Sequence, residues 1–343
     1  MNEGGARGGD EPAVLTAIPT YNAERFLPAT LDCLARQTRP PGRIVVIDNG
    51  STDGTEALAR GHPTLRIEWR RNESNVGVLG NLNRCLGLAT ETDYLHLLMA
   101  DDLVRPTFYE RCLPALEGLP AQGFSYVPDD KVNGQGRVVI PAPAPRRRAP
   151  RVVRAGEFIR RQSTLETVLL PGVLFRTRRS PVPARFDRFP QLADGVFLAE
   201  VAHRGWTVVE VPEVLCEYRL SDMNASSRHR SQVESFVRDE WRAMSLVAGW
   251  IPEPAWRRPL TRAWLRLRFA ARTEVKRQLF EQGNPGYAAE VDAVRREVAG
   301  WWVGALGVAV VRGRDWVRRM AGQPTRREEF ASLQGPGGGG GAA

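Results

Sequence analysis

The chain has 343 residues, of which 42% are hydrophobic and 25% charged, and its formal net charge is +9. The excess charge is carried by arginine, since Lys131 and Lys276 are the only lysines, and no motif for RNA or DNA accompanies it, so the composition does not favour a nucleic-acid partner. The cysteines are scattered without paired spacing, which excludes a thiolate metal site and a secreted disulfide framework. They are Cys33, Cys85, Cys112 and Cys216.

The length allows one catalytic domain followed by a helical region. We expect a disordered segment over 1–12, a domain over 13–226 with halves 13–120 and 121–226, a helical region over 227–330 and a disordered Gly-rich tail over 331–343. The first ten residues are polar and contain no apolar signal core, which predicts a cytoplasmic protein.

Strands and helices alternate from residue 14 to residue 99, which predicts an α/β fold with a mostly parallel sheet and right-handed crossovers. Leu27, Leu31 and Leu34 recur at helical spacing, a second helix is expected after the polar turn 48–54, and a third over 81–89. The expected strands are the apolar runs 14–18, 44–47, 65–69 and 94–99.

Two adjacent carboxylates, Asp101 and Asp102, directly follow the last of these strands. The carboxyl end of such a strand opens on the crevice where α/β folds bind ligands. The two charges repel each other unless a cation lies beside them, and oxygen ligands suit Mg²⁺ or Mn²⁺, which take further ligands from substrate phosphates. The pair predicts a metal–diphosphate site, although an ordinary solvated turn after a strand has the same pattern.

A series of motifs, in this order and spacing, resembles the family 2 glycosyltransferases, an inverting group with the GT-A fold. The resemblance is strong over residues 14–119, is still traceable to about 226, and does not cover the C-terminal third. The motifs are Pro19-Thr20-Tyr21-Asn22, Gln37-Thr38, the segment 46–55 that contains Asp48-Asn49, Asn75-Val76-Gly77, and Met99-Ala100-Asp101-Asp102.

The resemblance implies a nucleotide-sugar site with a divalent metal, Mg²⁺ or Mn²⁺, held by Asp102 and Asp101. Asn49 stands where the family usually has a second aspartate, which leaves the preferred base open, and Met99 stands where another aspartate is common. Considered singly, the same residues are also typical of turns, helix caps and glycine geometry. The implied donor-binding residues are Pro19, Thr20, Tyr21, Asn22, Asp48, Asn49, Asn75, Gly77 and Asp101.

The middle of the chain is expected to contain a helix over 106–119 and two strands, 124–127 and 138–140, joined by a turn at Asn133-Gly134. The segment 141–150 is rich in Pro and Arg and cannot form a helix or an inner strand. We interpret it as a solvated loop in preference to a charged flap over an anionic ligand.

Asp194 aligns with the acidic residue that opens a helix and acts as catalytic base in the family, and Asp187 is the alternative. The usual acidic neighbour is replaced by Ala193, and Asp194 can equally be a helix N-cap. Strands are expected over 206–211 and 214–220. Many members of the family have a histidine shortly after the strand that corresponds to 214–220. This histidine is absent here, so either Asp222 or a water would complete a metal site.

The implied reaction transfers a sugar from a nucleotide-diphosphate donor to an acceptor hydroxyl, with inversion, in polysaccharide or glycolipid assembly at the cell envelope. A nucleotidyltransferase is disfavoured because the first strand lacks a glycine-rich phosphate loop, and a dehydrogenase because Gly-x-Gly-x-x-Gly is missing. A degenerate scaffold subunit is the non-enzymatic alternative. Met99, Ala193 and Ser221 favour it, whereas retention of the four candidate aspartates argues against it.

The C-terminal third is expected to be helical, with Trp256, Leu260 and Trp264 on one face. The apolar run 301–311 is flanked by arginines and is too short to span a bilayer. Two interpretations stay open: a helix buried against the catalytic domain, and a peripheral contact of residues 256–320 with the inner face of an anionic membrane.

Overall fold

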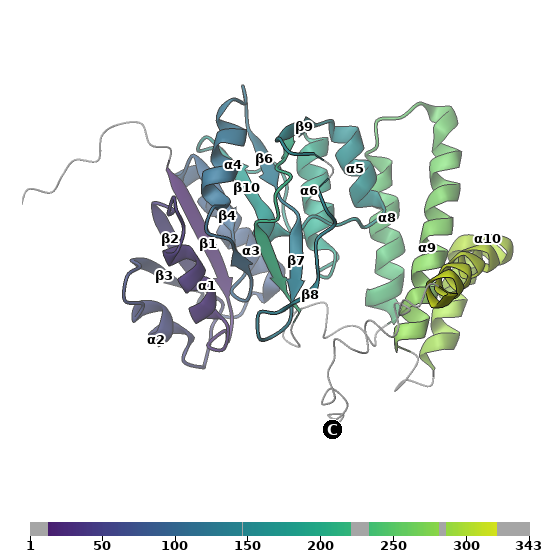
Figure 1. Ribbon diagram of the computed structural model, residues 1–343, viewed down its shortest axis with the longest axis horizontal. Coiled ribbons are helices and arrows are strands. Elements are labelled where there is room, and N and C mark those ends of the chain that lie inside the picture. The colour runs from purple at the N-terminus through teal and green to yellow at the C-terminus, as the bar shows by residue number, and fades with distance from the viewer. Residues whose placement is uncertain (1–12, 146, 221–232, 281–285, 321–343) are drawn as a thin grey trace, which may run out of the picture.

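The computed structural model describes residues 13–145, 147–220, 233–280 and 286–320 (Figure 1). The predicted terminal segments and Asp222 lie outside these residues. An eight-stranded mixed sheet forms the centre, in the order β3-β2-β1-β4-β10-β6-β11-β9. Strands β3, β2, β1 and β4 are parallel, as predicted, and β10 is antiparallel to both of its neighbours. The strands are β1 Val14–Thr20, β2 Arg43–Asp48, β3 Ile67–Arg71, β4 Tyr94–Leu97, β6 Gly123–Tyr126, β9 Arg151–Val153, β10 Val173–Arg176 and β11 Thr207–Glu210.

A second sheet has four strands in the order β5-β12-β7-β8, where β5 is Leu103–Val104, β7 Asp129–Val132, β8 Val138–Ile140 and β12 Cys216–Arg219. The predicted direct hairpin between 124–127 and 138–140 is wrong, because β7 lies between them and forms the hairpin with β8. Strand β7 reads Asp-Asp-Lys-Val and buries only alternate residues, so it contains no apolar run. The described residues of 141–150 form neither helix nor strand, as expected.

Helices cover both faces of the large sheet, which explains why its inner strands read as continuous apolar runs. In β1, Leu15 and Ala17 belong to one core, whereas Val14 and Ile18 belong to the core on the opposite face. Helix α3 begins four residues earlier than predicted, and Pro106 lies just before α4 instead of inside it. The helices are α1 Leu27–Ala35, α2 Thr55–Arg60, α3 Gly77–Gly87, α4 Phe108–Glu117, α5 Ala155–Ser163 and α6 Ala193–His203.

The C-terminal region is helical, as predicted, and consists of η3 Glu234–Arg238, α8 Asp239–Gly249, η4 Ala255–Arg257, α9 Arg258–Phe280 and α10 Tyr287–Met320. Ala243 and Val247 of α8 belong to the same core as the sheet, so α8 joins the two regions. Figure 1 shows α9 and α10 at the end of the molecule opposite to α2 and β3. Within the described part of the chain, no helix is both long enough and apolar enough to cross a membrane.

Two buried carboxylates connect these helices. Glu240 of α8 lies 2.6 Å from the Arg272 guanidinium and 3.2 Å from the Lys276 ammonium, both on α9. Glu274 of α9 lies 3.0 Å from Arg295 of α10. Because each charge meets an opposite charge across a helix interface, these contacts fix how the helices pack.

Candidate active site

The predicted site loops meet at one edge of the large sheet. Thr20, the last residue of β1, pairs in register with Asp48, the last residue of β2, and Ala17 pairs with Leu97 at the end of β4. Because the three strands are parallel and adjacent, the segments 20–22, 48–49 and 98–102 all leave the sheet on the same side. The structure therefore brings together the residues that the resemblance assigned to the donor and the metal.

The loop after β1 is held against the loop after β2 by reciprocal hydrogen bonds. The Asn22 side-chain oxygen accepts from the Thr52 backbone N–H at 2.9 Å, and the Ser51 hydroxyl oxygen accepts from the Asn22 N–H at the same distance. Asn22 has a φ of 47°, a left-handed conformation that asparagine tolerates better than most residues. These bonds leave the Tyr21 side chain 43% exposed, beside the half-buried Pro19 and the buried Thr20.

Asp48 is completely buried, and its carboxylate is already engaged by the protein. It accepts from the Ser51 backbone N–H at 3.0 and 3.2 Å and from the Ser51 hydroxyl at 2.5 Å. The Arg71 guanidinium lies 2.9 Å from the same carboxylate. Asp48 thus shapes its own turn.

Asn49 organises the loop before α3. Its side-chain oxygen accepts from the Val76 backbone N–H, and its amide group donates to the Asn75 side-chain oxygen, at 2.9 and 2.8 Å. Gly77 has a φ of 74°, so this loop needs glycine there. Asn49 and Asn75 therefore have a clear structural role, which is the alternative that the sequence left open for such residues.

The acidic pair is fixed from two sides. The Thr30 hydroxyl of α1 lies 3.0 Å from the backbone oxygens of both Ala100 and Asp102. Arg219 of β12 donates its backbone N–H to Asp102 Oδ1 and its Nε–H to the Asp101 backbone oxygen, each at 2.8 Å. The Asp102 carboxylate and the backbone of both acidic residues are therefore held in place by the protein itself.

The second oxygen of Asp102 is buried, and no hydrogen-bond partner accompanies it in the described structure. Burial raises the pKa of Asp102 well above its usual value, and the charge of Asp101 raises it further. Burial also raises the pKa of Asp101. A buried carboxylate oxygen without a donor fits a divalent cation, which supplies the missing positive charge.

The acidic pair would be the protein's share of such a metal site. Among the described residues, no group of three or more His, Cys, Asp or Glu is arranged to hold a metal ion. As far as the described residues show, a metal bound by the pair would take its further ligands from water or from a diphosphate, which is typical of Mg²⁺ sites, and Asp222 lies outside these residues.

Asp194 lies in the first turn of α6, but it is not the N-cap, because that position belongs to Leu192. Instead, Asp194 Oδ2 accepts the backbone N–H of Leu170 at 3.1 Å. The side chain is half-buried, and burial raises its pKa to about 6. The charge of Asp194 in turn raises the pKa of Asp102, so the two carboxylates share one electrostatic site.

The alternative base, Asp187, has different surroundings. Its side chain is 53% exposed and pairs with Arg188 at 2.5 Å, and this contact lowers its pKa. A carboxylate with a lowered pKa is a poor proton acceptor, so the geometry favours Asp194 over Asp187.

Several residues near the acidic pair were not predicted from the sequence as parts of the site. Lys131 of β7 pairs with Asp129, and its positive charge partly opposes the effect of burial on the pKa of Asp194. Asp129 adds to the negative charge around Asp102. For Asp129 and Lys131, the only signal in the sequence was the run of charged residues in β7. Arg219 was predicted to end a strand, but its contact with the acidic pair was not predicted.

Below the site, a chain of buried polar groups crosses the sheet. Nε2 of His96 lies 2.9 Å from the Pro171 carbonyl and Nδ1 lies 2.8 Å from the Tyr109 hydroxyl, which also contacts Thr16 at 2.6 Å. A carbonyl only accepts, so Nε2 carries the proton and Nδ1 accepts from Tyr109. Burial lowers the pKa of His96 to about 4, so the ring is neutral and its role is structural.

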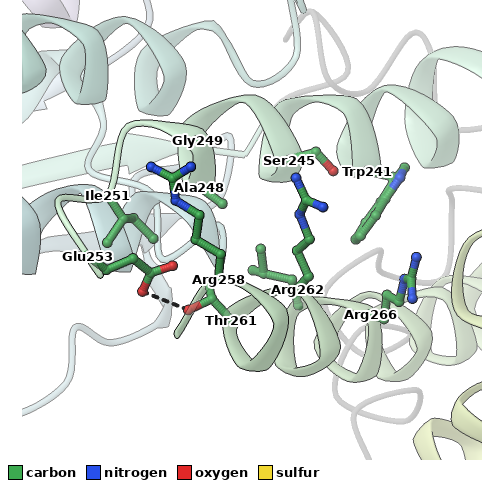
Figure 2. A pocket seen from close by; sticks show the side chains of 11 residues that line it. Trp241, Ser245, Ala248, Gly249, Ile251, Glu253, Arg258, Thr261, Arg262 and Arg266 are labelled. Carbon is green, nitrogen blue, oxygen red and sulfur yellow. Dashed lines mark hydrogen bonds between the residues drawn. The ribbon is translucent and has the colours of Figure 1, made fainter. Parts of the chain in front are cut away.

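A cavity of about 390 Å³ lies elsewhere, between α8 and α9 (Figure 2). Arg258, Arg262 and Arg266 line it from α9, and Trp241 lines it from α8. None of the residues predicted to bind the donor, the metal or the acceptor proton lines this cavity.

Comparison with known proteins gives a consistent result. Residues 16–164 match the family model described as glycosyl transferase family 2. The putative glycosyltransferase EpsE of Bacillus subtilis is 32% identical over 109 residues, which are 31% of this chain and 39% of that protein. A PGL/p-HBAD biosynthesis glycosyltransferase of Mycobacterium bovis is 42% identical over 94 residues, 26% of this chain and 36% of that protein. The chain thus spans less than half the length of the curated relatives it matches.

Solved structures share the fold over almost the whole chain. S. aureus TarS 1–349 in complex with UDP-GlcNAc aligns with a TM-score of 0.56 at 14% identity, covering 91% of this chain and 92% of that one. The mannosyltransferase PcManGT of Pyrobaculum calidifontis, in complex with GDP-Man and Mn²⁺, aligns with a TM-score of 0.54 at 18% identity, covering 95% and 86%. At these identities the likeness shows the fold, which is of the GT-A type.

Proposed function

We propose that this chain, whose residues 16–164 belong to glycosyl transferase family 2, transfers a sugar from a nucleotide-diphosphate donor to an acceptor hydroxyl. The observation that carries the proposal is the buried oxygen of Asp102 that has no hydrogen-bond partner in the described structure, at the carboxyl edge of the sheet, with Asp101 and Asp194 as neighbouring carboxylates. Such groups cost stability when left alone and are typical of a site completed by substrate and metal.

The donor would bind across the ends of β1, β2 and β4. Tyr21, with its exposed ring, is available to contact the base, and Pro19, Thr20 and Asn22 shape the loop that carries it. Asp48, Asn49, Asn75 and Gly77 support this surface mainly by fixing its loops. The two glycosyltransferase structures described above contain UDP-GlcNAc and GDP-Man, so both base types belong in a test.

Asp102, with Asp101, would hold Mg²⁺ or Mn²⁺, and the bound metal would act as a Lewis acid that offsets the charge of the departing diphosphate. The Asp102 oxygen without a hydrogen-bond donor is the specific feature that fits this role. Arg219 holds both acidic residues in place through the Asp102 carboxylate and the Asp101 backbone oxygen.

Asp194 would accept the proton of the acceptor hydroxyl as that oxygen attacks the anomeric carbon. The donor's bond to its diphosphate breaks in the same displacement, so the configuration at that carbon inverts. The Leu170 N–H fixes one oxygen of Asp194, and burial keeps its pKa near the working pH of a general base. We propose that the acceptor belongs to a polysaccharide or glycolipid of the cell envelope, and the curated relatives include a glycosyltransferase of PGL/p-HBAD biosynthesis.

The test measures release of nucleoside diphosphate from a panel of UDP- and GDP-linked sugars in Mn²⁺, with water as the acceptor of the sugar, for the wild type and Asp194→Asn. We expect turnover of one donor and a loss of about 10²–10⁴-fold in the variant. Asp187→Asn is the matched control, because it makes the same change at an exposed carboxylate, and it should keep wild-type turnover.

Two results would contradict the proposal in different ways. Equal turnover by the wild type and Asp194→Asn would mean that the base is another group. If the wild type consumed no donor of the panel and bound none, the scaffold alternative would replace the enzymatic one.

A further inference from the structure

One side of the last segment of α10, residues 301–320, is apolar along its whole length and faces outward. The residues on this side recur at helical spacing over about 27 Å. They are Trp302, Ala305, Leu306, Ala309, Val310, Gly313, Trp316, Val317 and Met320. Their larger side chains are between 53% and 79% exposed. We call these nine residues the apolar strip.

The opposite side of the same segment holds the helix in this orientation. Gly307 lies so close to α9 that an added Cβ would stand 2.6 Å from the Ala270 Cβ, and Val311 is 3% exposed. Gly300, with a φ of 73°, separates this segment from the preceding part of α10, which buries Val291 and Val294. The close crossing at Gly307 therefore directs the apolar strip away from α9.

The surroundings of the apolar strip are positively charged. Residues 301–320 contain Arg312, Arg314, Arg318 and Arg319 against Asp315, so four positive charges and one negative charge give +3. Helix α9, across which the segment packs, contains six arginines and one lysine against one glutamate, which gives +6.

Three of the α9 arginines add a further observation. Arg258, Arg262 and Arg266 lie in the groove next to α8 (Figure 2), and none has an ion pair with a carboxylate of the described residues. By contrast, Arg272 and Arg295 in the same helical region each contact a buried glutamate. The positive charge around α9 is therefore not balanced within the described protein.

We propose that the apolar strip of α10 binds the surface of an anionic lipid bilayer, with the helix lying in the plane of the membrane interface. An exposed apolar surface of this length is unusual unless it serves an interaction. Trp302 and Trp316 stand near its two ends, and tryptophan favours the interface between lipid headgroups and acyl chains. The helix lies on the bilayer without crossing it, which agrees with its mixed composition.

Charge decides between a membrane and a second copy of the chain as the occupant. Two copies joined through this side would bring two segments of +3 together, each packed on an α9 whose Arg258, Arg262 and Arg266 have no ion pair among the described residues, and the like charges would repel. Anionic headgroups instead attract arginines beside the inserted side chains. The proposal does not depend on the catalytic proposal, because it is tested by binding alone.

The experiment is co-sedimentation of the full chain with vesicles of pure phosphatidylcholine and with vesicles of equal parts phosphatidylcholine and phosphatidylglycerol. We expect the wild type to sediment with the mixed vesicles only, and less so at high salt, because salt screens the charges. The variant Leu306→Asp with Val310→Asp places two charges in the apolar strip and should lose at least about tenfold in apparent affinity.

Val152→Asp is the matched control, since Val152 of β9 is an apolar side chain of similar exposure, 62%, far from the strip in sequence. It should bind like the wild type. Trp316→Ser adds no charge and should cause a smaller loss in the same direction, which guards against a folding defect in the double variant. Thermal unfolding of each variant should match the wild type, because the replaced side chains are exposed.

Equal binding of the wild type and the double variant to the mixed vesicles would overturn the proposal, as would equal binding to both kinds of vesicle. Light scattering after size exclusion provides the remaining outcome. A wild-type dimer that the double variant converts to a monomer, without vesicle binding by either, would identify the apolar strip as an interface between copies and would also overturn it.

Discussion

Two buried carboxylates, Glu240 in the helical region and Asp102 in the sheet region, have opposite surroundings. In the helical region, burial acts to raise the pKa of Glu240, but the charges of Arg272 and Lys276 outweigh it and the pKa is lowered. In the sheet region, burial raises the pKa of Asp102 well above its usual value, and the neighbouring charge of Asp101 adds to the effect.

The contrast separates carboxylates that support the fold from carboxylates that await a ligand. A buried charge with its partner present is costly to break, because removal of one member leaves the other uncompensated. A buried charge without a partner costs stability in the free protein, and such a group is retained where function needs it. On this basis we assign a structural role to Glu240 and Glu274 and propose a functional role for Asp101, Asp102 and Asp194.

The largest expected effect on stability is that of Glu240→Gln. The variant leaves Arg272 and Lys276 without their shared carboxylate, so we expect the free energy of unfolding in urea to fall by about 3–5 kcal/mol. Glu234→Gln makes the same change at a side chain that is 64% exposed and should cost less than about 0.5 kcal/mol. If both variants lost a similar free energy of unfolding, the buried ion pair of Glu240 would not have the structural role assigned to it.

The raised pKa of Asp194 predicts an acid limit to turnover. The base accepts a proton only when ionised, so kcat at saturating donor and Mn²⁺ should fall about tenfold per pH unit below a pKa of about 6. The direction follows from burial, which favours the protonated, inactive form as the pH decreases. A kcat that stayed constant well below that pKa would show that Asp194 does not act as the base.

Asp102→Asn is expected to increase the free energy of unfolding, which is a smaller effect than that of Glu240→Gln and opposite in sign. The amide keeps an oxygen for the Arg219 N–H and removes a buried negative charge beside Asp101. In the absence of metal at neutral pH, the variant should be more stable than the wild type by about 0.5–2 kcal/mol. Urea denaturation measures this, and a loss of several kcal/mol would place Asp102 with the structural carboxylates.

The smallest effect is expected at the surface, where ion pairs are solvated. Arg43 contacts Glu68 at 2.8 Å and Glu91 at 3.2 Å, and its side chain is 42% exposed. Arg43→Gln should change the free energy of unfolding by less than about 0.5 kcal/mol. A larger loss in the same urea titration would mean that this network contributes more than exposed pairs usually do.

The sequence was sufficient for the parts of the site that follow buried strands. The apolar runs of β1, β2 and β4 mark where each strand ends, and parallel pairing brings Thr20, Asp48 and Asp102 to one edge. It was not sufficient for β7, because three charged residues followed by one valine do not resemble a strand, and Lys131 and Asp129 were therefore not placed near the site.

Interactions between distant segments could not be predicted from the sequence either. The contact of Arg219 with Asp102 joins residues 117 positions apart, and no local pattern encodes it. Likewise, the apolar sequence 301–311 was compatible both with a helix buried against the catalytic domain and with a helix exposed at a membrane surface. The close approach of Gly307 to Ala270, a tertiary feature, is what turns Trp302 outward.

The most direct test of the account is calorimetric titration of UDP and GDP into the wild type and Asp102→Asn, each with and without Mn²⁺. The account predicts that one nucleotide binds the wild type in the presence of Mn²⁺ and that its binding is lost without the metal or in the variant. Binding that is unchanged by Mn²⁺, or that persists in Asp102→Asn, would contradict the role assigned to the acidic pair.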